Sequence, residues 1–170
     1  MDFAAEPSHT LADPKELLLG YLDYYRTAIG RKLDGMPDDE LRNSRLPSGW
    51  TPLELVNHLL HMERRWLRWG FTAEQVDAPW GDADEHDRWV APPETTAAEL
   101  ITALHEGGEQ TRTIAGSADL ADLAAVGGRF QSDKERPTLA QILFHVLQEY
   151  ARHAGHLDIV RELADGRLGE

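Results

Sequence analysis

The chain has 170 residues, of which 41% are hydrophobic and 28% are charged, and this size and composition fit one globular domain. Its formal net charge is -13, from 30 acidic and 17 basic residues, which argues against binding to the phosphate backbone of nucleic acids. The chain has no cysteine, which excludes disulfides, thiolate nucleophiles and cysteine-rich zinc sites and leaves nitrogen and oxygen as the ligands of any metal.

The N-terminal segment carries no targeting signal. It has no basic stretch followed by an apolar run, and no part of the chain approaches the roughly 20 apolar residues of a membrane span. We therefore expect a cytoplasmic protein that binds no membrane, with a tail over residues 1–12 and one domain over residues 13–166.

The first predicted helix begins after Asp13. Asp13 is an N-cap, Pro14 occupies the first helical position, and Glu16 follows three residues after the cap. The helix is expected to end near Gly35, because glycine commonly terminates helices. A mostly apolar face is formed by Leu17, Leu18, Tyr21, Tyr25 and Ile29.

Three further helices are predicted from the same kind of start signal. Thr51 and Glu54 form a capping box, after which apolar residues recur at helical spacing to Trp69: Leu55, Leu59, Met62, Trp66 and Trp69. A third helix opens at Thr96 and runs to about residue 116. A fourth opens at Thr138 and ends near residue 166.

Four long helices with one apolar face each predict an all-α fold, an up-down four-helix bundle. Two connections, residues 72–94 and 117–137, are long for a compact domain, and such loops often serve as lids or binding loops. Within the second, Asp119 to Val126 is a candidate for a short additional helix. Trp80 and Trp89 in the first are candidates to close over a site.

The last predicted helix carries a stripe of polar groups on a largely apolar background. Taking His145 as the reference, Glu149 lies about 40° away, His153 about 80° and His156 about 20° around the helix axis. A carboxylate and three imidazoles are costly to bury without partners. The alternative is a solvated acidic face, in which the histidines flank a salt bridge to Arg152.

A divalent metal would satisfy this stripe. Glu149 and His153 are four residues apart and can chelate one ion together. A third ligand must come from a facing helix. His58 is the best candidate, and His61, one turn further on, is the weaker one. The alternative interpretation of His58 is a core histidine that is held by hydrogen bonds and binds no metal. Such ligands leave zinc, nickel, manganese and iron open as the ion.

Three segments carry a resemblance to a known family: Gly49-Trp50-Thr51-Pro52, LELVNHLLHMERRW and HVLQEYARHAGHLDIVREL. Together, and over about residues 13–165, they resemble the DinB/YfiT-like superfamily of metal-binding four-helix bundles. The resemblance implies a three-residue site for zinc, nickel or a similar ion, with His58 as first ligand and Glu149 and His153 as the pair on the last helix.

Glu149, where many relatives have histidine, looks like the mycothiol-dependent branch, which includes maleylpyruvate isomerase. A chain without cysteine fits a protein that takes its thiol from a cofactor. The sequence departs from the common His-Arg-Gly-Gln ending, because His156 stands where glutamine is usual. His156 could be an outer hydrogen-bond acceptor, a fourth ligand or a replacement for Glu149.

These observations predict a metal-dependent transferase or isomerase, in which a metal-bound thiolate of mycothiol or another small thiol attacks a small electrophile. His61 or His156 would shuttle the proton. Arg65 would bind a carboxylate of the thiol cofactor, with a salt bridge to an acidic neighbour as the alternative. A non-catalytic metal-binding stress protein and a metal-assisted hydrolase remain open, as does a homodimer.

Overall fold

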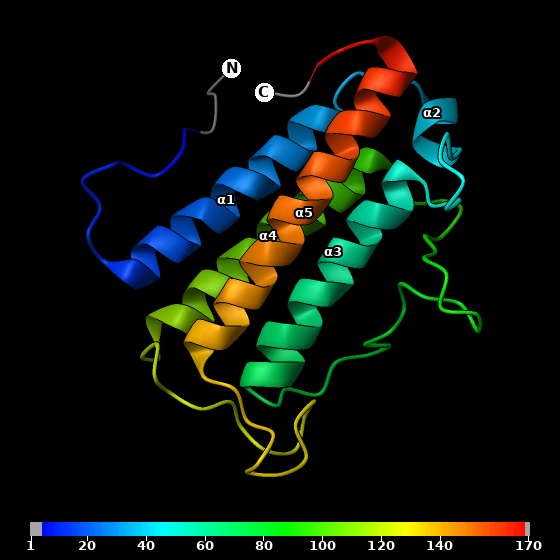
Figure 1. The fold of residues 1–170 in the computed structure, drawn as a ribbon. Helices are drawn as coiled ribbons and strands as arrows, with labels where there is room; N and C mark the ends of the chain where they lie inside the picture. The colour runs from blue at the N-terminus through cyan, green and yellow to red at the C-terminus, as the bar shows by residue number, and fades with distance from the viewer. Residues whose placement is uncertain (1–4, 169–170) are drawn as a thin grey trace.

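A computed structural model describes residues 5–168, and within that range all regular secondary structure is helical. The elements are α1 (Pro14–Leu33), α2 (Asp38–Arg42), α3 (Pro52–Trp66), the π-helical turn η1 (Leu67–Phe71), α4 (Ala97–Gly116) and α5 (Leu139–Asp165). The four long helices lie side by side (Figure 1), and both α1 and α3 contact α4 and α5. The prediction of an all-α fold is confirmed.

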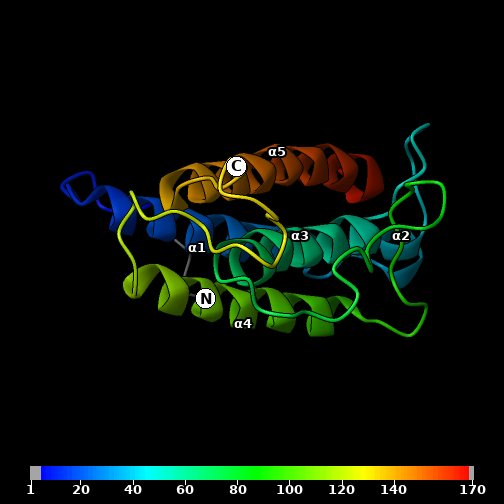
Figure 2. The ribbon, with the colours of Figure 1, turned by 90° about the horizontal axis from the view of Figure 1, so that it is seen from below.

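In Figure 2, α4 and α5 lie on opposite sides of α1 and α3. The apolar interior between them is drawn from all four helices and includes Leu22, Leu59, Leu104 and Leu143, none of which is more than 1% exposed. One polar network crosses this interior. The Glu63 carboxylate of α3 accepts hydrogen bonds from Arg26 of α1, Thr111 of α4 and Tyr150 of α5, so it links all four helices.

The predicted start signals are confirmed. The Asp13 side chain accepts hydrogen bonds from the amides of residues 15 and 16, and Thr51, Thr96 and Thr138 each form a capping box. The predicted ends of the first and last helices are confirmed to within two residues, because α1 ends two residues before Gly35 and α5 ends at Asp165, with Gly166 as its left-handed C-cap. Side-chain capping of free backbone amides therefore sets the start of each long helix.

The structure differs from the sequence prediction in three places. The five-residue helix α2 was not predicted. The segment 119–126 is not helical, because its backbone pairs with the first turn of α5: the amides of Leu139 and Ala140 donate to the carbonyls of Asp122 and Leu120 at 2.9 Å. The regular helix predicted to reach Trp69 ends earlier, at residue 66, and continues as the π-helical turn η1.

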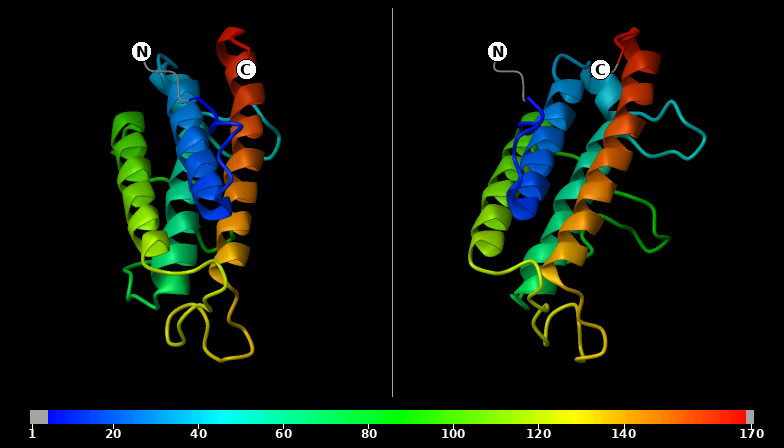
Figure 3. Two further views of the ribbon diagram at one scale, coloured as in Figure 1. Left: turned by 90° about the vertical axis from the view of Figure 1, so that its left-hand side faces the viewer. Right: turned by 60° about the vertical axis from the view of Figure 1, so that its left-hand side comes forward.

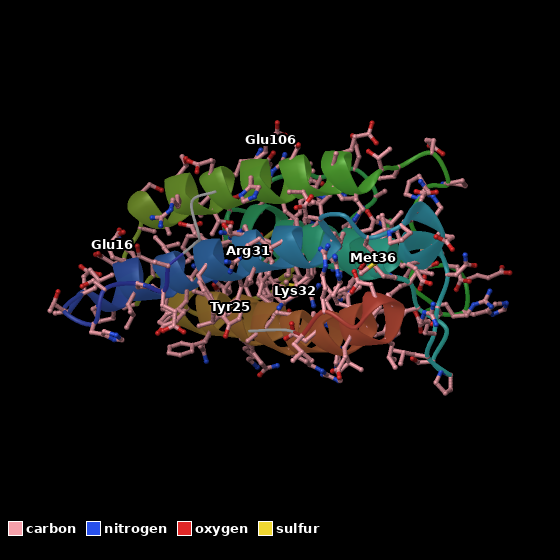
Figure 4. The ribbon with its side chains drawn as sticks, turned by 90° about the horizontal axis from the view of Figure 1, so that it is seen from above. Glu16, Tyr25, Arg31, Lys32, Met36 and Glu106 are labelled. Atoms are coloured by element: carbon pink, nitrogen blue, oxygen red, sulfur yellow. The ribbon has the colours of Figure 1, made fainter. Side chains whose placement is uncertain are left out.

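The long connections lie on the outside of the helices. Figure 3 shows the 117–138 segment (yellow) at the end where α4 finishes and α5 begins, whereas the segment after η1 (green) runs beside α3. On another side, Lys32 of α1 points toward α5 (Figure 4), where it forms an ion pair with Asp158. The helices are thus held by polar contacts at their edges as well as by the apolar interior.

Residues 5–12 of the predicted tail form no helix. Pro7 lies against Gly20 of α1, where an added Cβ would come within 2.9 Å of the proline ring. The remainder of that predicted tail, residues 1–4, lies outside the described residues. Of the helices between residues 5 and 168, none combines the length and the apolar character needed to cross a membrane.

Candidate metal centre

Three potential ligands from two helices meet at one point. His58 of α3 and Glu149 and His153 of α5 each present one ligand atom, and these atoms lie within 4.8 Å of one another. We call this group the His–Glu–His centre. The predicted convergence of the three side chains is confirmed, and the contact between α3 and α5 produces it.

The spacing within the His–Glu–His centre is compatible with a divalent ion. Metal–nitrogen and metal–oxygen bonds of about 2.0–2.2 Å place two ligand atoms of one ion about 3–4 Å apart. His153 Nε2 and Glu149 Oε2 are already 3.1 Å apart. The remaining ligand atoms need to approach by less than about 1 Å. Three protein ligands would leave at least one coordination position open.

His58 is oriented by a carboxylate from the long connection after η1. Its Nδ1 lies 2.9 Å from Oδ2 of Asp82 and donates to it, which leaves Nε2 to face the centre. Asp82 is only 2% exposed, and the guanidinium of Arg65 pairs with both of its oxygens. Such a carboxylate behind a ligating histidine fixes the ring and raises its basicity.

Asp82 stays ionised in spite of its burial. Burial alone would raise its pKa, but the hydrogen bonds from His58 and Arg65 outweigh that effect and lower the pKa to about 2. The ionised carboxylate keeps the His58 proton on Nδ1. The lone pair on the other ring nitrogen therefore points toward Glu149 and His153.

His153 has an equivalent outer partner. Its Nε2 faces Glu149, while its Nδ1 lies 3.2 Å from Nδ1 of His156. His156 thus occupies the outer position, the first of its three predicted roles, and is not one of the three clustered residues. Burial first, and then the neighbouring His58, lower the pKa of His153 to about 4, so its ring is neutral near pH 7 and offers a lone pair.

Aromatic rings enclose the centre. Trp89 stacks on the His58 ring, with centroids 4.3 Å apart and an angle of 18°, and its edge meets His153 at 5.2 Å. Trp50 lies beside Trp89 and His156, at 6.2 and 6.0 Å. Trp89 thus covers one face of the His58 ring, and Trp50 lies beside the ring of His156.

A cavity of about 580 Å³ opens beside these indoles. We call it the indole-lined cavity. Its lining combines apolar, acidic and hydroxyl groups with one guanidinium: Ser48, Gly49, Trp50, Glu54, Asp84, Asp87, Arg88, Trp89 and Val90. Trp89 both lines this cavity and stacks on His58, so its indole lies between the cavity and the His–Glu–His centre.

Two residues predicted to take part in the chemistry lie outside the cluster. His61 donates from Nδ1 to the carbonyl of Asn57 at 3.0 Å, and its Nε2 lies against Gly81. Arg65 was predicted to bind a cofactor carboxylate, but its guanidinium is buried against Asp82 and the Pro79 carbonyl. The alternative interpretation of Arg65 was a salt bridge to an acidic neighbour. The structure shows this salt bridge, with Asp82 as the partner, in a buried position.

The sequence prediction missed one important residue, Asp82. The only available signal was the length of the 72–94 connection, which indicated a binding loop without indicating which side chain would reach the site. Trp89, a candidate for closing over the centre, does contact His58 and His153. Trp80 instead packs against Arg65, whose guanidinium lies 4.4 Å from its ring.

The sequence profile of the mycothiol-S-transferase family matches residues 17–166. The chain belongs to the mycothiol-S-transferase family. This family is part of the DinB/YfiT-like superfamily, so the predicted resemblance is confirmed. The matched range covers the His–Glu–His centre and nearly all of the four long helices, and membership implies a mycothiol-related transferase with a thiol as substrate. No curated protein matches the chain significantly.

Proposed function

We propose that the chain is a metal-dependent S-transferase that joins a mycothiol-type thiol to a small electrophile at the His–Glu–His centre. The observation that carries this proposal is the convergence of His58, Glu149 and His153 within 4.8 Å in a member of the mycothiol-S-transferase family. The chain has no cysteine of its own, so the sulfur must come from a cosubstrate. Zinc is the ion we favour, with nickel, manganese or iron as alternatives.

A bound divalent ion would supply a strong positive charge that deprotonates a coordinated thiol near neutral pH. The residues of the chain hold and orient that site. Asp82 and His156 occupy Nδ1 of His58 and His153. The Nε2 of His153 faces Glu149, and His58 offers its remaining ring nitrogen within 4.8 Å of the other two ligand atoms. The four-helix bundle that we propose for α1, α3, α4 and α5 is supported by the contacts of α1 and α3 with both other helices.

We assign the body of the thiol to the indole-lined cavity. Its lining has three carboxylates and one guanidinium, so it carries net negative charge and disfavours an anionic thiol. The same carboxylates can accept hydrogen bonds from hydroxyl groups, while Trp50 and Trp89 provide apolar faces. An uncharged, hydroxyl-rich thiol is the ligand that this lining suits best.

His156 is the better placed of the two predicted proton shuttles. It contacts Trp50, which lines the indole-lined cavity, and it also contacts His153. It therefore lies between the proposed thiol seat and the centre, which is the position that a proton shuttle needs. His61 is less suitable because its Nε2 is covered by Gly81.

The decisive experiment measures metal content and turnover on the same protein. The metal-loaded chain is expected to consume an electrophile only when mycothiol is present, and treatment with a chelator should abolish that activity. Turnover with metal and water alone would favour the hydrolase. A full equivalent of metal without turnover, on a panel of electrophiles, would favour the non-catalytic metal-binding protein.

A further inference from the structure

Arg129 is a cation without an anionic partner. Its guanidinium lies 4.4 Å from the ring of Trp66 and 5.3 Å from that of Trp80. Within residues 5–168, its side chain makes no hydrogen bond or ion pair. The contrast is Arg65, which also lies over Trp80 but is paired with Asp82.

The backbone around Arg129 is firmly held. Its amide donates to the carbonyl of Trp69 in η1 at 3.1 Å, and the amide of Ala125 donates to the carbonyl of Phe71 at 2.8 Å. At Gly128, an added Cβ would overlap the Trp69 carbonyl, so only glycine allows this approach. The π-helical turn thus anchors the loop, and such turns are frequent at functional sites.

A series of side-chain contacts connects this cation to the His–Glu–His centre. Trp66, which contacts Arg129, also packs on His145 with ring centroids 4.2 Å apart. His145 Nε2 in turn lies 3.7 Å from Oε1 of Glu149. Burial lowers the pKa of His145 and the charge of Arg129 lowers it further, which is consistent with their proximity.

Arg129 and the indole-lined cavity flank the centre along α5. His145, on the Arg129 side, precedes Glu149 by one turn, whereas His156, on the Trp50 side, follows His153 by almost one turn. The two outer histidines are therefore about 16 Å apart along the helix axis. One side can hold the thiol while the other receives the second substrate. Trp80 is 54% exposed, so the Arg129 side is open to solvent.

An unpaired guanidinium in a partly buried position is unfavourable by itself. Burial and the nearby Arg65 both oppose its charge and lower the pKa of Arg129. A carboxylate would relieve this cost, because a guanidinium donates two parallel hydrogen bonds to the two oxygens of a carboxylate. The local charge is also opposite in sign to the net charge of -13 for the whole chain.

We infer that Arg129 binds a carboxylate of the electrophilic substrate and holds that substrate beside the His–Glu–His centre. The inference rests on the proposed function, because it names the class of electrophile that the same centre would use. A suitable electrophile is an alkene activated by a carbonyl group and bearing one free carboxylate. Addition forms a bond from sulfur to one alkene carbon, and the thiol proton ends on the other carbon, so no further reactant is required.

Two closely related probes test this inference: monomethyl fumarate, which has one carboxylate, and dimethyl fumarate, which has none. Binding of each to the metal-loaded protein without thiol is measured by calorimetry. Arg129→Gln should weaken the binding of monomethyl fumarate at least about tenfold, since a hydrogen bond to a charged group contributes about 1.5–3 kcal/mol. The affinity for dimethyl fumarate should change less than about twofold in the same variant. Arg129→Lys, which keeps the charge, should retain part of the affinity.

Arg152→Gln is the matched control, because it removes one guanidinium from an exposed position next to His153 in the sequence. It should leave the binding of monomethyl fumarate unchanged. Equal binding of the two fumarates by the unaltered protein, or unchanged binding of monomethyl fumarate in Arg129→Gln, would overturn the inference. Absence of thiol transfer with both probes would instead refute the proposed function, because the binding measurement needs no turnover.

Discussion

Glu149 and His153 lie one turn apart on α5, and their facing atoms Oε2 and Nε2 are 3.1 Å apart. A helix provides this pair without help from the remainder of the fold, because residues four apart share one face. The third member, His58, reaches them only because α3 packs against α5. The proposed metal site therefore depends most on the tertiary contact, and His58 is the residue on which to test it.

We predict that His58→Ala lowers metal affinity by more than about 100-fold, since loss of an outer partner alone typically costs about 10–100-fold. Helix content should be retained, because His58 is only partly buried and the apolar residues around it remain. Elemental analysis and circular dichroism measure the two effects. His61→Ala is the control and should keep a full equivalent. A full equivalent in His58→Ala would mean that the third ligand is another residue.

Asp82→Asn tests the outer partner of His58. The amide keeps the shape of the side chain but loses the charge that holds the His58 proton on Nδ1. We predict a fall of about 10–100-fold in metal affinity, measured by competition with a chromophoric chelator at a temperature at which the protein is folded. Asp84→Asn, which removes a carboxylate bonded to Arg88 instead, should leave the metal affinity unchanged. Equal metal affinities in the two variants would contradict the role of Asp82.

The parts of the fold that were predictable from the sequence depend on local interactions. Thr51, Thr96 and Thr138 cap helices through contacts three residues away, so the signal and its effect lie within one turn. The Glu149–His153 pair is equally local. His58 could be found because it lies on the helix that carries an inward-facing apolar stripe.

The residues that could not be predicted act over long distances in the sequence. Asp82 reaches His58 from 24 residues away, through a connection without regular structure. Arg129 meets Trp66 only because Gly128 permits its loop to lie against η1. The segment 119–126 has a helical pattern, but its carbonyls pair with the free amides of α5 instead. In each case a tertiary contact decides the conformation.

The pH dependence of stability gives a prediction for the metal-free protein. The pKa of His153 is about 4 in the folded chain, against an ordinary value of 6.5. Between these values the unfolded chain binds more protons, so the free energy of unfolding falls as the pH falls. The loss from this one group is complete below about pH 4.

Urea unfolding of the chelator-treated protein at several pH values between 4 and 7 measures this effect. His153→Gln, which cannot gain the proton, should show a smaller decrease in the free energy of unfolding over that window. Identical pH dependence in the two proteins would show that His153 does not resist protonation in the folded state. After reloading with zinc, the variant should also fail to retain the metal, because it lacks one of the three proposed ligands.

Gly128→Ala tests whether the anchoring of its loop positions Arg129. An added Cβ would overlap the carbonyl of Trp69 and contact the backbone of Ala73, so the loop must move away from η1. We predict at least about tenfold weaker binding of monomethyl fumarate, because displacement of the guanidinium removes the same charge-assisted hydrogen bonds as its substitution. Metal content should be unchanged, since the variant leaves all three proposed ligands in place.

Gly155→Ala is the matched control for this change. Gly155 lies within α5, directly before His156, and an added Cβ there meets no atom within 4 Å. Alanine is favoured over glycine inside a helix by about 0.5–1 kcal/mol, so this variant should be at least as stable as the unaltered protein and bind the probe equally well. If Gly128→Ala also bound the probe with unchanged affinity, Arg129 would not need the contact with η1, and its placement beside Trp66 would have to come from the two indoles alone.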